Sequence, residues 1–406
     1  MQKDIYPLQK DIYWVGVIDQ TLGVFDITEF TEFGSTYNAY LVVGSEKSAI
    51  IDTAKVNFSE DFLAKIESII PLSKIDYLVL NHTEPDHSGS VQTLLEKNPH
   101  LTVISSAPGL SNLKEIVNLP FHSIRAKEDL EISLGDKTLT FSLQPNLHWP
   151  DTMFTYIPET HALFTCDFFG AHYAYEGVVS SVMKNADEYI GAMKYYFECL
   201  MTPFKKDVHR ALDWIESKEV SFVGTSHGAV IDDRFLDQAK ALYRAWAEIP
   251  ARNEIPMIAI PYTSVYGYTR QMLPYVVKGV QEAFEGKVQV EVYDLVETTR
   301  EDVIQAIRQS DGFLIGSTTI LGDAVKPVWD LLTSLNPQID GGKPAGVFGS
   351  YGWSGEGVKY VQDRLGQLKM KTVEPFRIRF QPSTEQLEEC VAYGKSFGEF
   401  VKNQLN

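Results

Sequence analysis

Histidines and acids that could bind metal ions stand at four places in the first part of the chain. Four of them lie in residues 82–87, which read HTEPDH and directly follow a short apolar segment, residues 77–80. Three more, His148, Asp167 and His227, lie at the ends of other strand-like segments. A loop at a strand end can turn such side chains toward one point, which the surface of a helix cannot do. The pattern therefore predicts a metal centre built from strand ends.

The order of these residues, H-x-E-x-D-H followed by H, D and H, resembles the metallo-β-lactamase superfamily, whose first motif is usually H-x-H-x-D-H. Glu84 takes the place of the middle histidine here. Zinc sites favour nitrogen-rich, tetrahedral ligand sets. A carboxylate in place of an imidazole makes the site harder and favours iron. The flavodiiron branch of the superfamily carries this substitution, and the spacing from His82 to His227 is similar to that branch.

The resemblance to flavodiiron proteins implies a pair of non-haem iron ions. The expected ligands are His82, Glu84 and His148 for one iron, Asp86, His87 and His227 for the other, and Asp167 as the bridge. In some family members the residue that matches His87 is turned away from its iron, so the role of His87 stays open. His172 and Tyr195 are candidates for orienting ligands or relaying protons, and packing roles fit these two residues equally well.

The segment before the strand-like residues 37–43 departs from the family pattern. Many members carry a histidine there, close to the substrate. Residues 24–28 of this chain read VFDIT, with Asp26 and no histidine. If this loop covers the iron pair, access to the pair and the choice between oxygen and nitric oxide would differ from other members.

A phosphate-binding loop is predicted in the second half. Residues 261–270 follow an apolar strand and open a helix, and hydroxyl groups, a glycine and free backbone N–H groups at a helix N-terminus form a phosphate site. The loop lacks the patterns of a P-loop and of a dinucleotide site. It resembles the S/T-x-T-G-x-T loop of flavodoxins. The expected contact residues are Ser264, Val265, Tyr266, Gly267, Tyr268 and Thr269.

Two later loops would complete this site. In a doubly wound sheet, ligands bind beyond the carboxyl ends of the strands at the switch point, and all three loops lie at that edge. Glycines there allow close approach of a ligand, and the resemblance to short-chain flavodoxins makes FMN the expected cofactor. The expected contacts are Ser317, Thr318, Thr319 and Ile320 in the first loop, and Ser350, Tyr351, Gly352, Trp353 and Gly355 in the second.

The surrounding elements divide the chain into two domains. Short β-branched and aromatic runs dominate the first half, and a regular alternation of strands and helices follows the proline-bounded residues 249–256. Repeated βα units with buried strands predict a doubly wound parallel sheet. We therefore expect an α/β protein. Residues 1–252 would form a metallo-β-lactamase-like αββα sandwich with the di-iron site, and residues 253–406 a flavodoxin-like, FMN-binding domain with a five-stranded parallel sheet.

Composition narrows the class of protein. A chain of 406 residues with 44% hydrophobic and 22% charged residues has the length and composition of a two-domain globular protein. Its net charge of −18 argues against a nucleic-acid partner. No apolar run approaches the roughly 18 residues of a membrane span, and the N-terminal residues lack the apolar stretch of a secretion signal, which favours the cytoplasm. The three cysteines are too far apart for a rubredoxin module or an iron–sulfur cluster.

These features predict an oxidoreductase. An external donor, rubredoxin or a reduced deazaflavin, would reduce FMN, and FMN would reduce an iron pair that converts oxygen to water or nitric oxide to nitrous oxide. The resemblance also implies a head-to-tail homodimer or a dimer of dimers, because flavin and iron of one subunit are too far apart in this family.

A zinc hydrolase of the glyoxalase type with an appended flavodoxin domain is one alternative, which Glu84 disfavours. An electron carrier with an inactive first domain is another, which the complete ligand set disfavours. The sequence leaves open the preferred gas, the donor, and the choice of dimer or tetramer.

Overall fold

The computed structural model describes residues 5–27, 29–175, 177–249 and 253–405. It divides into two compact units, Met1–Ile249 and Pro250–Asn406. The boundary expected at residue 252 lies outside the described residues, next to this division. Each unit is considered by itself below.

Two sheets pack face to face in the first unit. The seven-stranded sheet contains, in spatial order, β1 (Tyr6–Gln9), β2 (Ile12–Trp14), β7 (Tyr40–Val43), β8 (Ser48–Ile51), β9 (Tyr77–Val79), β10 (Thr102–Ser105) and β11 (His122–Arg125). The six-stranded sheet contains β12 (Glu131–Ser133), β13 (Thr138–Leu143), β14 (Met153–Ile157), β15 (Ala162–Cys166), β16 (Phe222–Thr225) and β17 (Ile231–Asp232). All residues of β14 and β15 are buried. These strands are covered on both faces, which explains why they read as continuous apolar runs instead of alternating ones.

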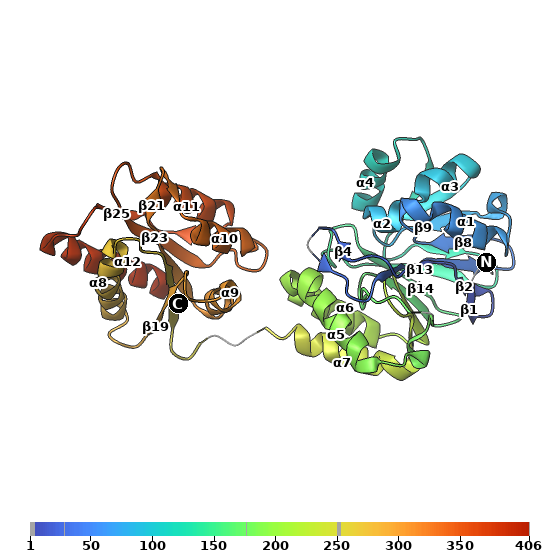
Figure 1. The fold of residues 1–406 in the computed structure, drawn as a ribbon. Coiled ribbons are helices and arrows are strands. Elements are labelled where there is room, and N and C mark those ends of the chain that lie inside the picture. The colour runs from blue at the N-terminus through green and yellow to red at the C-terminus, as the bar shows by residue number, and fades with distance from the viewer. Residues whose placement is uncertain (1–4, 28, 176, 250–252, 406) are drawn as a thin grey trace. The chain divides into compact units, whose positions relative to one another are not determined.

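Helices cover the outer face of each sheet (Figure 1). The seven-stranded sheet packs against α1 (Ser59–Glu67), α3 (Val91–Lys97) and α4 (Ala107–Val117), and the short α2 (Pro85–Ser88) follows β9. The six-stranded sheet packs against α5 (Ala186–Tyr196), α6 (Lys205–Glu216) and α7 (Asp233–Trp246). Helix α6 packs on the sheet through one apolar face. The buried residues of this face recur at helical spacing: Val208, Ala211, Leu212 and Ile215. The first unit is therefore the αββα sandwich expected from the sequence.

Two apolar runs, residues 12–18 and the strand-like residues 37–43, are each divided between two strands. Residues 12–18 form β2 and β3 (Val17–Asp19), and residues 37–43 are divided between β6 (Ser35–Tyr37) and β7. The chain leaves the main sheet at Gly16, where a Cβ atom would come within 2.4 Å of the Tyr37 carbonyl oxygen. β3 and β6 then pair with each other. A second ribbon, β4 (Val24–Phe25) with β5 (Glu29–Phe30), lies between them in the chain and was not expected from the sequence.

The second unit is a doubly wound parallel sheet. Its strand order is β19 (Gln289–Asp294), β18 (Met257–Tyr262), β20 (Gly312–Gly316), β23 (Pro344–Tyr351), with two short strands, β24 (Lys371–Thr372) and β25 (Phe376–Arg379), sharing the last position. Helices α8 (Tyr268–Ala283) and α12 (Thr384–Leu405) cover one face. Helices α9 (Arg300–Gln309), α10 (Lys326–Ser334) and α11 (Glu356–Gln367) cover the other. A small hairpin, β21 (Thr319–Ile320) with β22 (Asp323–Ala324), follows β20.

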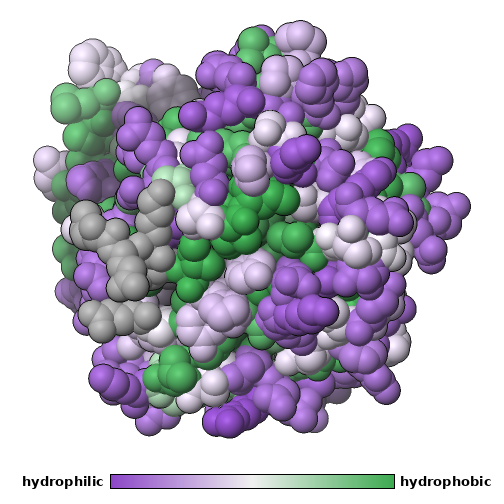
Figure 2. All heavy atoms as spheres, turned by 90° about the vertical axis from the view of Figure 1, so that its right-hand side faces the viewer, coloured by the Kyte–Doolittle hydropathy of each residue, from purple (hydrophilic) through white to green (hydrophobic). Residues whose placement is uncertain are grey.

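Polar side chains dominate the face drawn in Figure 2, with a smaller hydrophobic area near its middle. None of the helices in the described ranges is both long enough and apolar enough to span a bilayer.

Candidate functional site

The loop after β9 carries four of the expected ligands. The chain leaves this buried strand through Leu80 and Asn81, which are fully buried. Glu84 then caps the single turn α2, and its carbonyl oxygen accepts hydrogen bonds from the N–H groups of His87 and Ser88 at 2.9 Å. A loop that turns this sharply brings residues that are adjacent or alternate in the sequence to a common site.

The other expected ligands come from the six-stranded sheet. His148 lies between β13 and β14, Asp167 directly follows β15, and His227 follows β16. β14 is antiparallel to β15, and β15 is parallel to β16. The beginning of β14 and the ends of β15 and β16 therefore meet at one edge of the sheet. The Met153 N–H donates to the carbonyl oxygen of Asn81 at 2.8 Å, which joins this edge to the loop after β9.

The side chains converge in two groups. The first group is His82, Glu84, His148 and Asp167, and the second is Asp86, His87 and His227; within each group the donor atoms lie within 4.8 Å of one another. Asp167 faces both groups. Its Oδ2 atom is 3.4 Å from Nε2 of His148, and its Oδ1 atom is 3.1 Å from Nε2 of His87. One carboxylate with an oxygen toward each group has the geometry of a bridge between two ions.

The site fits a pair of cations. Oδ1 of Asp86 is buried and has no hydrogen-bond partner within the described residues, and Oδ2 of Asp86 and Oδ2 of Asp167 face imidazole nitrogens at 3.0 Å (His227) and 3.4 Å (His148). Buried carboxylate oxygens without hydrogen bonds are costly unless they bind a cation. The donor set mixes four imidazoles with three carboxylates, which suits iron better than the nitrogen- and sulfur-rich sets of structural zinc. The imidazole of His87 faces the site, which supports the predicted ligand role that the sequence left open.

The carboxylates give this site a strongly negative field. Burial alone lowers the pKa of His82, but hydrogen bonds to Asp151 and Glu84 outweigh it and raise the pKa to about 10. Burial likewise disfavours the charged form of His148, and the contacts with Asp167 and Glu84 raise its pKa to about 10. A field that holds protons on buried imidazoles also favours a metal cation between the same groups.

Several residues that the sequence did not identify support the ligands. Asp151 lies 3.1 Å from Nδ1 of His82. The Nδ1 atom of His227 is 2.5 Å from the Thr36 carbonyl oxygen. Oδ1 of Asp167 accepts hydrogen bonds from the hydroxyls of Ser226 at 2.6 Å and Tyr196 at 2.8 Å. Partners of this kind fix the orientation of metal ligands.

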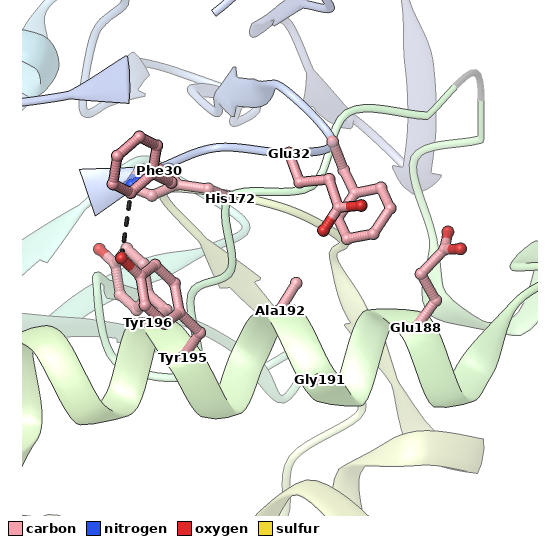
Figure 3. A pocket seen from close by; sticks show the side chains of 9 residues that line it. Phe30, Glu32, His172, Glu188, Gly191, Ala192, Tyr195 and Tyr196 are labelled. Carbon is pink, nitrogen blue, oxygen red and sulfur yellow. Dashed lines mark hydrogen bonds between the residues drawn. The ribbon is translucent and has the colours of Figure 1, made fainter. Parts of the chain in front are cut away.

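The two candidates for proton relay or ligand orientation lie at a cavity of about 470 Å³ beside α5 (Figure 3). His172 is buried, its Nδ1 atom is 2.8 Å from the Ser35 hydroxyl, and its Nε2 atom is 3.6 Å from Glu29. Burial and the neighbouring His227 hold the pKa of His172 well below its usual range, which favours the neutral imidazole. Tyr195 is 38% exposed, and its hydroxyl accepts from the Phe30 N–H at 3.4 Å. Within the described residues, no hydrogen bond or ring contact joins Tyr195 to an expected ligand, whereas the hydroxyl of the adjacent Tyr196 donates to Asp167.

The histidine-free loop lies beside the metal centre. Asp26 stands at the turn of the β4–β5 hairpin, and burial together with the hydrogen bond to Glu84 raises its pKa to about 6. The Asp26 carboxyl group therefore lies next to Glu84, an expected iron ligand. In the family pattern described above, this loop carries a histidine instead.

A second cavity, of about 500 Å³, lies at the carboxyl edge of the parallel sheet. Ten of the fifteen expected contact residues line it, namely Val265, Tyr266, Tyr268, Thr318, Thr319, Ile320, Ser350, Tyr351, Gly352 and Trp353. Ser264, Gly267, Thr269, Ser317 and Gly355 do not line it. Gly267 and Gly355 precede α8 and α11 with φ of 82° and 75°, which glycine adopts without strain. Thr269 is buried beside the hydroxyls of Thr318 and Ser350. Arg379 and Phe380 line the cavity and were not expected.

Comparison with known proteins covers both units. The family described as ODP family beta lactamase matches residues 36–228, and the family described as Flavodoxin matches residues 260–394. Flavo-diiron protein FprA2 of Clostridium acetobutylicum is 34% identical over 399 residues, which cover 97% of this chain and 99% of that protein. A nitric oxide reductase of Moorella thermoacetica is 33% identical over 398 residues, which cover 95% and 96% of the two chains.

The fold of the whole chain also has a solved counterpart. The structure of the rubredoxin oxygen:oxidoreductase of Desulfovibrio gigas aligns with a TM-score of 0.67 and 24% identity, covering 99% of this chain and 100% of that one. At this identity the match shows the shared two-domain fold.

Proposed function

The chain belongs to the flavodiiron protein family, and from this premise we propose that it reduces oxygen, nitric oxide or both at a pair of non-haem iron ions, with electrons passed through FMN. In balanced form, oxygen with four electrons and four protons gives two waters. Two nitric oxide molecules with two electrons and two protons give nitrous oxide and one water. The observation that carries the proposal is Asp167, whose two carboxylate oxygens face the two ligand groups.

The proposed ligands are those expected from the sequence: His82, Glu84 and His148 for one ion, Asp86, His87 and His227 for the other, and Asp167 between them. Two adjacent ferrous ions would each supply electrons to one bound substrate, and FMN would accept electrons from a donor and pass them on. The chain's own contribution is positioning. Asp151 and the Thr36 carbonyl fix two imidazoles, and Tyr196 and Ser226 fix the bridging carboxylate.

His172 is the residue we assign to proton supply in this reaction. It lines the cavity beside α5, contacts Ser35 through Nδ1, and its ring centroid lies 4.8 Å from that of His227. Glu29, whose pKa burial raises to about 7, lies on its other side. A neutral imidazole between a carboxyl group and a hydroxyl can accept a proton on one nitrogen and release one from the other. Tyr195 lines the same cavity, and its hydroxyl contacts the backbone of Phe30.

The partners that we propose follow the family. The electron donor is rubredoxin or a reduced deazaflavin, and the working unit is a head-to-tail homodimer or a dimer of dimers in the cytoplasm. The surface beside the metal centre supports a protein contact there: on the β4–β5 hairpin, Ile27 is 95% exposed and Phe30 74% exposed. Exposed apolar side chains that cluster next to a functional site are typical of interaction surfaces.

The experiment that tests this function measures both gases on one preparation. Protein loaded with iron and FMN and supplied with excess reduced rubredoxin should consume oxygen, or should consume nitric oxide with formation of nitrous oxide. The control is Asp167→Ala loaded in the same way, which should lose both activities. If the wild-type protein consumed neither gas above a metal-free sample, the proposed function would be wrong. Zinc binding with thioester hydrolysis would then favour the glyoxalase-type alternative.

A further inference from the structure

A charged residue, Arg379, lines the second cavity. Arg379 is the last residue of β25 and pairs in register with Tyr351 of β23. It lines the cavity of about 500 Å³ together with Tyr351, Gly352, Trp353 and Phe380. Its guanidinium carbon lies 5.6 Å from the ring centroid of Phe380, in a cation–π contact. Arg379 is therefore part of the wall, and its guanidinium lies beside Phe380, which also lines the cavity.

Arg379 is the one charged residue among the described residues that line this cavity. The others carry hydroxyl, aromatic, aliphatic or no side chains, and no aspartate or glutamate is among them. This differs from the chain as a whole, whose net charge is −18. The cavity thus has a locally positive wall in an acidic protein.

Close contacts hold the end of β25 against the neighbouring loop. The Phe380 N–H donates to the Tyr351 carbonyl oxygen at 2.7 Å. Arg377, two residues before Arg379 on the same strand, donates to the Gly355 carbonyl oxygen at 2.9 Å and lies over the Tyr351 ring. A Cβ atom at Gly352 would come within 2.9 Å of the Phe380 ring. The backbone of Arg379 is therefore fixed relative to the loop that forms the neighbouring part of the wall.

We propose that Arg379 raises the reduction potential of bound FMN by stabilising its anionic reduced form. The isoalloxazine ring is neutral when oxidised, and uptake of two electrons and one proton leaves an anionic hydroquinone. The proposed donor supplies the electrons and water supplies the proton. A positive charge at the cavity wall lowers the free energy of the anion and leaves the neutral ring almost unaffected. The inference rests on FMN occupying this cavity. A higher reduction potential makes electron transfer from the donor to FMN more favourable.

The test is a potentiometric titration of the full-length, FMN-loaded protein, followed by flavin absorbance. Arg379→Gln should weaken binding of reduced FMN relative to oxidised FMN by about tenfold, which lowers the two-electron potential by about 30 mV. Arg379→Lys keeps the positive charge, so its two-electron potential should stay close to that of the wild-type protein. Arg364→Gln is the matched control, because Arg364 lies on α11 in the same unit and does not line the cavity. The shift should shrink as salt is added, since the arginine is exposed.

Each outcome decides the inference. If Arg379→Gln and Arg364→Gln have the same two-electron potential, charge at position 379 does not tune the flavin. The same conclusion follows if the potential of Arg379→Lys is lowered as much as that of Arg379→Gln. If Arg379→Gln loses FMN on purification, titration with oxidised and with reduced FMN still gives the ratio of the two dissociation constants. The expected ratio changes about tenfold, and an unchanged ratio overturns the inference. A wild-type protein that binds no FMN would instead contradict the FMN site on which the inference rests.

Discussion

Asp151 and His82 form a buried carboxylate–imidazole pair, with Oδ1 of Asp151 3.1 Å from Nδ1 of His82 and both side chains fully buried. The other oxygen of Asp151 accepts hydrogen bonds from the Thr83 N–H at 2.8 Å and the Thr83 hydroxyl at 2.6 Å. The carboxylate is thus fixed by the residue next to the histidine that it orients. Nδ1 of His82 is occupied by this contact, and Nε2 is directed to Glu84 at 3.2 Å.

The pair predicts the effect of Asp151→Asn. The amide keeps the shape of the side chain but removes the charge that fixes the His82 tautomer. Iron affinity should fall by about 10- to 100-fold, the usual cost of losing such a partner. Competition with a chelator measures this, with Asp237→Asn as the control, since the Asp237 side chain is 91% exposed and lies on α7. Equal iron retention in the two variants would contradict the role given to Asp151.

Two adjacent tyrosines should differ in their effect on the metal centre. Tyr196→Phe removes a buried hydroxyl that donates to Asp167 at 2.8 Å and should lower iron affinity by about tenfold. Tyr195→Phe removes a hydroxyl that contacts the Phe30 backbone and the Cys199 side chain, neither of them an expected iron ligand, and should leave iron affinity unchanged. Iron content after dialysis against a chelator distinguishes them. A larger loss in Tyr195→Phe than in Tyr196→Phe would reverse the assignment.

A glycine directly before the loop that lines the second cavity should be irreplaceable. A Cβ atom at Gly349 would lie 1.8 Å from the Ser317 carbonyl oxygen, a clash that only backbone movement can relieve. Gly349→Ala should therefore lose FMN and lower the unfolding temperature. Gly366→Ala is the matched control: it lies on α11, where a Cβ atom meets nothing within 4 Å, and should stabilise the chain by about 0.5–1 kcal/mol. FMN retention in Gly349→Ala would mean that the loops can separate without losing the cofactor.

The two cofactors should protect different parts of the chain. A ligand at 100 times its dissociation constant stabilises the folded state by about 2.7 kcal/mol. Adding iron to the metal-free protein should slow amide exchange in the loop after β9 and at the ends of β15 and β16. Adding FMN should slow exchange in the loops after β18, β20 and β23. Hydrogen-exchange mass spectrometry resolves these segments. Iron-induced protection in other segments, with none in the loop after β9, would show that the ions bind elsewhere.

The residues that converge in the two groups, and most residues that line the second cavity, could be singled out from the sequence because both sets follow strand ends. A buried strand is visible as an apolar run, and the parallel or antiparallel order of strands decides which ends meet. The same rule could have identified Arg379, which ends β25, the last strand in the chain. Asp151 and Ser226 were missed because their partners are remote in the chain and only the packing of two sheets brings them together.

The positions of Tyr195 and Tyr196 around helix α5 could have shown from the sequence which of them points toward the interior. The buried residues of α5 are Tyr189, Met193 and Tyr196, at spacings of four and three, so Tyr196 lies on the inner face and Tyr195 beside it. The β4–β5 hairpin had no comparable signal. Its strands are two residues each, and Asp26 and Ile27 take positive φ values of 44° and 70° without a glycine. Contacts with the metal-site loop, such as that of Asp26 with Glu84, hold it in place, and these are invisible in the sequence.

The central claim is a pair of iron ions joined by Asp167, and Mössbauer spectroscopy of protein loaded with iron-57 tests it most directly. The account predicts two irons per chain whose oxidised form is a coupled, diamagnetic pair, and loss of that coupling in Asp167→Ala. One iron per chain, or two magnetically independent irons in the wild-type protein, would contradict the claim.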